Sequence, residues 1–163
     1  MRLSRRITCH QNTAGHAVVR KSLVYPGCMT HDGYTRRKDS RCPFCEMPGD
    51  RRVSENELAY AIRDAFPVTP SHTLLIPKRH VRSYFELDTA EFEACYQLLH
   101  KEKATIERED SDVWGFNVGV NDGEAAGQTI SHCHIHLIPR RKHDVEDPRG
   151  GVRNVIPGRA AYP

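Results

Sequence analysis

Three histidines occupy alternate positions in the segment SHCHIHLIPR, at residues 131–140. In a β-strand, side chains two residues apart point to the same face. His132, His134 and His136 would therefore form one polar row, with roughly 6.6–7 Å between neighbours. Histidine is an uncommon residue, so this row is not an ordinary exposed polar face. The alternate residues would face the core: Cys133, Ile135 and Leu137.

A row of imidazoles suits two kinds of chemistry. Two alternate histidines of a strand can both bind one zinc ion. A neutral imidazole can also act as a nucleophile and form a covalent intermediate. The preceding loop, NVGVNDGEAAGQT at residues 117–129, carries amides, a hydroxyl and three glycines that let the backbone approach a ligand. These donors suit phosphate oxygens, whereas a purely metallic site would favour carboxylates. The combination favours a phosphate-bearing substrate.

A second motif, CPFC at residues 42–45, brings two thiols together. This spacing is typical of a zinc half-site or of a redox pair. A thioredoxin-like redox motif is disfavoured because no helix signal follows Cys45. The chain has six cysteines and no secretion signal, which argues against a disulfide scaffold.

The surrounding pattern predicts an α+β domain with a mostly antiparallel sheet. A helix is expected over residues 88–108, with Asp88 as its N-cap and Glu91 three residues later. This helix would lie across one face of the sheet. Strands are expected at residues 51–54, 58–64, 71–77, 114–120 and 131–138, with a further short strand at 154–158.

Length and composition indicate one ordinary globular domain. The 163 residues are 38% apolar and 28% charged, and the formal net charge is +3. We interpret residues 1–40, with eight Lys or Arg and two acids, as a basic and irregular N-terminal extension, and residues 41–163 as the folded domain with an irregular C-terminal tail. The first residues lack the apolar region of a secretory signal, and no apolar run is long enough to span a membrane. We therefore expect a cytoplasmic protein without a membrane partner.

Two segments resemble the signature blocks of the histidine triad (HIT) family. NDGEAAGQTISHCHIHLIPR, at residues 121–140, resembles the family pattern His-φ-His-φ-His-φ-φ, in which φ is apolar. IRDAFPVTPSHTLLIPKRH, at residues 62–80, resembles its first block, with Ser71 where relatives usually have glycine. The likeness covers residues 42 to about 140. It is strongest to fragile-histidine-type dinucleoside polyphosphate hydrolases and their bacterial relatives.

The resemblance implies a HIT-like fold, a five-stranded mostly antiparallel sheet with one long helix packed on a face. It also implies a homodimer in which the helix and a strand of each subunit pair. His134 would attack the α-phosphate of a nucleotide and form a nucleotidyl-histidine, which water then hydrolyses. A hydrogen bond from its other ring nitrogen, to a backbone carbonyl, would fix its tautomer. His136 would hold a phosphate oxygen or assist the leaving group.

The resemblance assigns the substrate contacts residue by residue. Asn121, Gln128 and Thr129 would bind the phosphates, and Asp64 would accept the ribose hydroxyls. His72 matches a frequent family histidine, for which we expect a structural hydrogen bond. Dinucleoside polyphosphates such as diadenosine tetraphosphate are the expected substrates, and Mg²⁺ could accompany them.

Zinc-bearing members of the family resemble this chain in their metal ligands. Cys42, Cys45, His80 and His132 would hold a structural Zn²⁺, so that only His134 and His136 face the substrate.

Two other functions remain open from the sequence. A Hint-type phosphoramidase acting on AMP conjugates has the same catalytic residues. A non-catalytic, zinc-stapled module could instead bind nucleotides or, through its basic arm, nucleic acid. We do not expect nucleic acid as a partner, because a basic arm of this kind is more often simply solvated.

Overall fold

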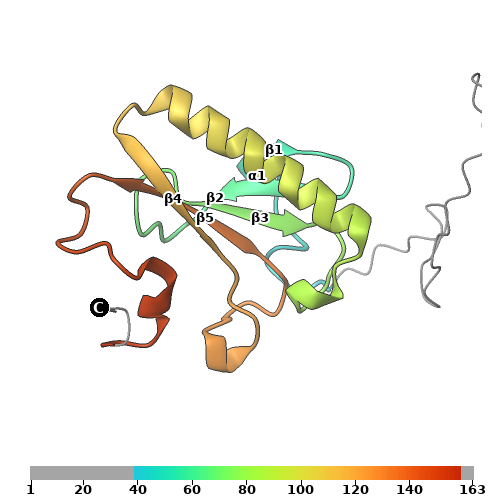
Figure 1. Cartoon of the computed structure of the whole chain (residues 1–163). Helices are drawn as coiled ribbons and strands as arrows, with labels where there is room; N and C mark the ends of the chain where they lie inside the picture. The colour runs from blue at the N-terminus through green and yellow to red at the C-terminus, as the bar shows by residue number, and fades with distance from the viewer. Residues whose placement is uncertain (1–38, 159–163) are drawn as a thin grey trace, which may run out of the picture. The chain divides into compact units, whose positions relative to one another are not determined.

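The fold is an open five-stranded sheet with one long helix across a face (Figure 1). The computed structural model describes residues 39–158, so the extension expected at residues 1–40 lies almost wholly outside the described residues. The strands are all antiparallel and run in the order β1-β2-β3-β5-β4, which confirms the predicted α+β class. The elements are β1 (Arg52–Glu55), β2 (Ala59–Arg63), β3 (Thr73–Pro77), α1 (Thr89–Glu109), β4 (Val113–Gly119) and β5 (Ile135–Arg141).

Helix α1 begins where its capping signal predicts. The Asp88 side chain accepts a hydrogen bond from the Glu91 N–H, and the Glu91 side chain accepts one from the Asp88 N–H. This reciprocal pair satisfies two donors at the first turn that have no partner within the helix. The helix then packs one stripe onto the sheet through four buried residues, Ala94, Cys95, Leu98 and Ile106.

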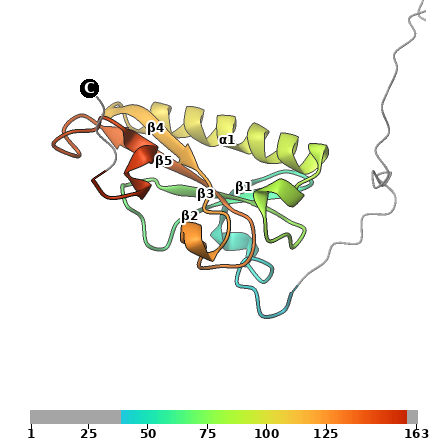
Figure 2. The ribbon, with the colours of Figure 1, turned by 60° about the horizontal axis from the view of Figure 1, so that its bottom comes forward.

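Strands β2 and β3 are buried on both faces of the sheet. On the helix side, alternate residues of β2, β3 and β5, such as Ala61, Leu75 and Leu137, pack against α1. On the opposite side, the intervening residues pack against the CPFC segment, which Figure 2 shows below the sheet while α1 lies above it. The residues of this second cluster are Cys42, Phe44, Cys45, Tyr60, Ile62, Leu74 and Ile76.

Two buried ion pairs tie α1 to the segments that carry candidate site residues. Glu91, fully buried, accepts two hydrogen bonds from Arg79 at 2.8 and 2.6 Å. Glu102, which is 2% exposed, pairs with Arg63 at 2.9 Å. A buried carboxylate is stable only with such a partner. The helix therefore holds in place the neighbours of Arg79 and Arg63, which are His80 and Asp64.

Strand β5 is shorter at its start than the sequence predicts. It begins at Ile135 rather than Ser131, so His132 and His134 precede the strand. The pairing with β3 ends at Leu75–Ile135, and two residues further on β3 reaches Pro77, which has no N–H to donate. The chain turns instead: the Cys133 N–H binds the Val81 carbonyl at 2.7 Å. The predicted inward set is confirmed, because Cys133, Ile135 and Leu137 are all buried.

Two further local features differ from simple expectation. Ser71, where relatives usually have glycine, has a φ of 65°, in the left-handed region that favours glycine. The strand predicted at residues 154–158 is wrong: Gly151–Val155 form a 3₁₀ turn after Gly150, which has a φ of 82°. Such a left-handed glycine ends extended chain and starts a turn.

Within residues 39–158 no helix has the length and apolarity needed to cross a bilayer.

Candidate active site and metal centre

Two thiols and two imidazoles converge beneath the sheet. The Cys42 Sγ lies 3.4 Å from the His132 Nδ1, and the Cys45 Sγ lies 3.3 Å from the His80 Nδ1 and 3.7 Å from the His132 Nδ1. One ligand atom of each residue lies within 4.8 Å of the other three. The chain thus brings together all four residues named from the sequence as metal ligands.

The geometry of this cluster fits a tetrahedral ion. Zinc bonds of about 2.3 Å to sulfur and 2.0–2.1 Å to nitrogen put those atoms roughly 3.5–3.6 Å apart at a tetrahedral angle. The His132 Nε2 lies 2.9 Å from the Pro77 carbonyl, which can only accept, so Nε2 carries the proton and Nδ1 presents its lone pair to the sulfurs. Burial lowers the pKa of His132 to about 4, which keeps this lone pair free at neutral pH. Cys42, Cys45, His80 and His132 can therefore bind a metal ion.

His134 presents the opposite ring nitrogen. Its Nδ1 lies 2.8 Å from the carbonyl oxygen of His132, so Nδ1 carries the proton and Nε2 keeps a lone pair. This is the backbone hydrogen bond expected for a nucleophilic imidazole. The ring packs edge-on against Phe44, with centroids 5.2 Å apart. Phe44, the aromatic residue of CPFC, is 5% exposed and contacts the His132 ring as well.

The His136 ring contacts two other imidazole rings, those of His134 and His72. Its ring centroid lies 5.1 Å from that of His134, and its Nδ1 lies 3.0 Å from the His72 Nε2. The other nitrogen of His72 lies 3.3 Å from the Asp64 Oδ2. Burial is the main cause that lowers the pKa values of His136, to about 4, and of His72, while the Asp64 carboxylate opposes the shift in both.

The glycine-containing loop is held in place by its own side chains. Gln128 accepts a hydrogen bond from the Gly123 N–H and donates one to the Arg82 carbonyl, both at 2.8 Å. Asp122 accepts from the Ser83 hydroxyl at 2.8 Å and from the Tyr84 N–H at 2.7 Å. The amide of Gln128 is thus committed to the loop. Thr129 is exposed and Asn121 is half-buried.

Sequence reasoning missed two contributors to this site, Phe44 and Asp122. The structural hydrogen bond predicted for His72 is confirmed, and its partner is His136. The pairing of His72 with His136 depends on the register of β3 with β5, which places Leu74 opposite His136.

Known proteins match most of the described chain. The family model described as HIT domain matches residues 48–143. An uncharacterized 16.1 kDa HIT-like protein of Mycoplasma pneumoniae is 39% identical over 106 residues, which cover 63% of this chain and 73% of that protein. A bis(5'-adenosyl)-triphosphatase of Dictyostelium discoideum is 37% identical over 91 residues, 56% of this chain and 60% of that enzyme.

Solved structures share the fold. The crystal structure of a HIT family protein from Bacillus anthracis superposes with a TM-score of 0.59 at 37% identity, covering 64% of this chain and 76% of that one. The crystal structure of a zinc-bound histidine triad family protein from Mycobacterium smegmatis has a TM-score of 0.57 at 34% identity, with 64% and 78% covered.

Proposed function

The chain belongs to the HIT family, and we propose that it is a nucleotide hydrolase that works through a covalent nucleotidyl-His134 intermediate. The most suitable substrates are dinucleoside polyphosphates of the diadenosine tetraphosphate kind. The single observation that carries this proposal is the hydrogen bond from the His134 Nδ1 to the His132 carbonyl. In a neutral ring this bond places the proton on Nδ1 and leaves the lone pair on Nε2, which is the atom that attacks phosphorus.

The reaction divides one displacement into two. The His134 Nε2 forms a bond to the α-phosphorus while the bond to the leaving polyphosphate breaks. Water then forms a P–O bond, and the P–N bond breaks to release the nucleotide. Phe44 and the neighbouring rings fix the direction of the attacking nitrogen, which reduces the entropy cost of reaching the transition state.

The loop at residues 121–129 is the proposed phosphate site. Asn121 and Thr129 are the side chains of this loop that remain available to a ligand, while Gln128 and Asp122 keep the loop in its conformation. The second hydrogen of the Gln128 NH2 group is still free to donate to a phosphate oxygen. Asp64 is the proposed ribose acceptor, because a carboxylate has about four acceptor positions and can accept hydroxyls in addition to its present partners.

Zinc is the proposed metal of the cluster formed by Cys42, Cys45, His80 and His132. Two thiolates and two imidazoles are the ligand set of structural zinc sites, which have no open position for a substrate. When bound, the ion would lock the CPFC turn to the segment before β5. Mg²⁺ is proposed only as a counter-ion of the substrate, because neither potential metal cluster among residues 39–158 consists of carboxylates alone.

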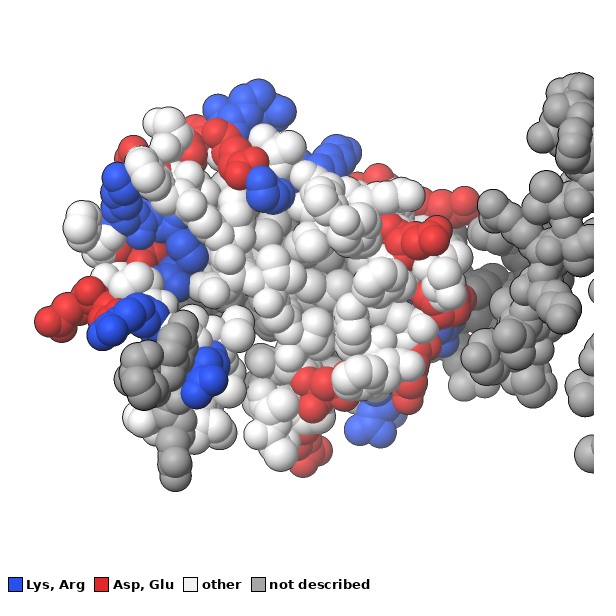
Figure 3. Space-filling view, viewed as in Figure 1, with Lys and Arg blue, Asp and Glu red and all other residues white. Residues whose placement is uncertain are grey.

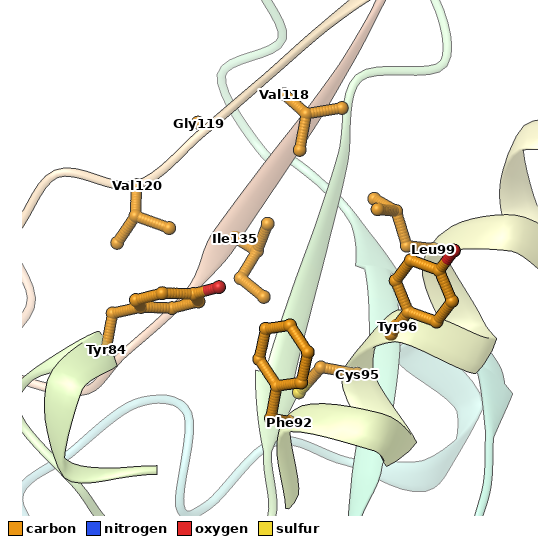
Figure 4. A pocket seen from close by; sticks show the side chains of 9 residues that line it. All are labelled: Tyr84, Phe92, Cys95, Tyr96, Leu99, Val118, Gly119, Val120 and Ile135. Carbon is orange, nitrogen blue, oxygen red and sulfur yellow. The ribbon is translucent and has the colours of Figure 1, made fainter. Parts of the chain in front are cut away.

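We further propose a homodimer formed through β4 and α1. Strand β4 is an edge of the sheet, and edge strands present unpaired backbone groups. Beside it lies an apolar hollow in which Phe92, Tyr84 and Ile135 face one another (Figure 4). Figure 3 shows few charges at the centre of this face. Three residues that line the hollow are exposed by 43% or more: Phe92, Tyr96 and Val118.

Light scattering during gel filtration tests the homodimer. The wild-type particle should have twice the 18.6 kDa mass of the chain, and Phe92→Glu should shift it toward the monomer. A wild-type monomer at micromolar concentration would contradict this part of the proposal.

The activity itself is tested by steady-state turnover of diadenosine tetraphosphate, with AMP-lysine and an AMP ester as competing substrate classes. His134→Ala should lose at least about 10³-fold in kcat, because no other group takes over the covalent step. Metal content and melting temperature should stay at wild-type values. A preference for AMP-lysine would favour a phosphoramidase, and unchanged turnover in His134→Ala would remove the nucleophile role.

A further inference from the structure

Strand β4 carries a polar side chain on the face of the sheet to which His136 belongs. Gly119 of β4 pairs with His136 of β5. Two residues earlier in β4, Asn117 pairs with Ile138, and side chains two residues apart share a face. Asn117 therefore lies diagonally across from His136, at about 7–8 Å. His136, Ile138 and Asn117 are each half-buried, so this part of the face is open to a ligand.

Two charged residues fix the orientation of the Asn117 amide. The Arg140 Nη1 donates a hydrogen bond to the Asn117 Oδ1 at 2.6 Å. A guanidinium group can only donate, so Oδ1 must face it and the NH2 group must point elsewhere. Arg140 is itself held by Asp144, to which it donates two hydrogen bonds at 2.8 and 2.7 Å. The side chains of Arg140 and Asp144 are only 22% and 18% exposed, so this support is well ordered.

The C-terminal tail leaves room beside this NH2 group. The 3₁₀ turn η5 (Gly151–Val155) packs against β4, on the side of the sheet away from α1 (Figures 1 and 2). A Cβ atom at residue 151 would lie 3.3 Å from the Asn117 Nδ2, where the two groups would crowd each other. Within residues 39–158, the side chain of Asn117 uses only its Oδ1 in a hydrogen bond. Both hydrogens of the NH2 group can therefore be donated to a molecule that enters beside the tail.

The charge of the tail suits an anion. Residues 139–158 carry five Lys or Arg and three Asp or Glu, whereas the loop at residues 121–129 carries two acids and no Lys or Arg. Figure 3 shows Lys and Arg side chains gathered at the end of the molecule where β5 finishes. An excess of positive charge raises the local concentration of anions. A neutral NH2 donor in these surroundings suits phosphate oxygens.

The order of the strands indicates which part of a substrate reaches Asn117. Asp64, the proposed ribose acceptor, follows β2, and Asn117 lies in β4, so the two residues are on opposite sides of β5. A nucleotide with its ribose at Asp64 and its α-phosphate at His134 occupies the side of β2 and β3. Only the part of the substrate beyond the α-phosphate is left to extend over β4.

We propose that Asn117 is a substrate-binding residue for the leaving half of a dinucleoside polyphosphate. Its NH2 group donates to the phosphates beyond the α-phosphate, and Arg140 and Asp144 are positioning residues that aim it. The inference rests on the proposed function and deepens it. It explains how the enzyme would prefer a substrate whose leaving group carries several phosphates over an AMP ester or AMP-lysine, in which the leaving group carries none.

Two substitutions of Asn117 test the contact. Asn117→Ala removes the donor, and kcat/KM for diadenosine tetraphosphate should fall by about 10-fold. Asn117→Asp keeps an oxygen for Arg140 but replaces the donor with a negative charge, so the fall should reach about 100-fold. With an AMP ester of nitrophenol as substrate, both variants should stay within about 2-fold of wild type. Gln97→Glu makes the same amide-to-acid change on the exposed side of α1 and is the matched control, with no loss on either substrate.

The role of Arg140 is tested by a variant that keeps its charge. Arg140→Lys loses the rigid fork that holds both Asp144 and Asn117. It should lower kcat/KM for diadenosine tetraphosphate and leave turnover of the ester unchanged. In the Asn117→Ala background it should have no further effect, because it acts through that amide. An additive loss in the double variant would overturn the positioning role.

Inorganic tripolyphosphate tests the site without a nucleoside. Its inhibition constant against hydrolysis of the AMP ester should rise by about 10-fold in Asn117→Asp and stay unchanged in Gln97→Glu. Equal losses on the two substrates in the Asn117 variants, or unchanged inhibition by tripolyphosphate, would overturn the inference and leave the proposed function standing. Hydrolysis of neither substrate by the wild type would overturn both.

Discussion

Two groups of polar residues flank His134, and each contains one of its neighbours in the triad. On one side, His132 joins Cys42, Cys45 and His80 in a convergent cluster. On the other, His136 joins His72 and Asp64 in a linear chain. The first has thiols, which suit a metal, while the second has one carboxylate and no thiol.

The difference lies in which ring nitrogen each histidine has available. The His132 Nε2 binds the Pro77 carbonyl, so its Nδ1 faces the sulfurs. The His134 Nδ1 binds the His132 carbonyl, which leaves its Nε2 available, whereas the His136 Nδ1 contacts the His72 Nε2, so that one of these two rings donates to the other. Identical side chains at alternate positions thus receive separate roles from the partner of the second nitrogen.

Cys42→Ser should produce the largest change that separates the two groups. The variant loses one thiolate, so bound zinc should fall from about one equivalent to near zero. The free energy of unfolding should fall by on the order of 5 kcal/mol, because a metal that binds only the folded state stabilises it. His136→Gln should instead keep its metal and stability and lose activity. Metal analysis with thermal unfolding checks both, and equal metal loss in the two variants would erase the distinction.

Arg79→Met should weaken metal binding by the cluster around Cys42 and leave the group of Asp64, His72 and His136 unchanged. The substitution leaves the fully buried Glu91 carboxylate without its bidentate partner. Removing one member of a buried pair costs about 3–5 kcal/mol, and His80 is the next residue along the chain. Chemical denaturation should show this loss, together with faster removal of zinc by a chelator. The double variant Arg79→Met/Glu91→Leu, which removes both charges, should recover part of the stability; a further loss would argue against the buried charge as the cause.

The linear chain should make stability depend on pH. Folding lowers the pKa of His136 to about 4, whereas an unfolded histidine titrates near ~6.5. Between these values the unfolded chain binds a proton that the folded chain does not, so stability falls as the pH decreases from about 6.5 to 4. Each such group contributes at most about 1.4 kcal/mol per pH unit. When the free energy of unfolding, measured with urea, is plotted against pH over this range, His136→Asn should have a smaller slope than the wild type. An unchanged slope would mean that His136 is not buried in its neutral form.

Ser71→Gly should give the smallest effect and should leave both groups unchanged. A non-glycine residue at a φ of 65° is strained by about 1–2 kcal/mol, and the added freedom of glycine in the unfolded chain offsets about half of that. A gain of up to about 1 kcal/mol is expected from thermal unfolding, with unchanged kcat. His143→Gly, at a φ of 63° in an exposed turn, is the matched control. Destabilisation by Ser71→Gly would show that the serine side chain contributes more than its backbone costs.

Local patterns predicted most of the fold. Asp88 and Glu91 marked the start of α1 because capping depends on neighbouring residues alone. The alternation of Cys133, Ile135 and Leu137 predicted which side faces the core, because the period of two holds even where the strand has not yet begun. The start of β5 was predicted four residues too early, since it depends on Pro77, a residue of another strand.

The metal cluster was predictable in part because four Cys and His residues at family spacing point to one chemistry. The Asp64–His72–His136 chain was not, because it depends on the register between β3 and β5 and on ring orientations that no spacing reveals. The commitment of the Gln128 amide to Gly123 and Arg82 was hidden for the same reason. Contacts between distant segments are fixed by tertiary packing, which a single sequence does not display.

The most direct measurement is the site of nucleotide attachment after rapid acid-free quenching of wild-type protein mixed with diadenosine tetraphosphate. Intact mass should rise by one adenylyl group while zinc stays bound, and peptide mapping should place the added phosphoramidate on His134. Attachment to His132 or His136, or turnover of the substrate with no added mass at any mixing time, would contradict a mechanism in which the middle imidazole of the triad attacks phosphorus.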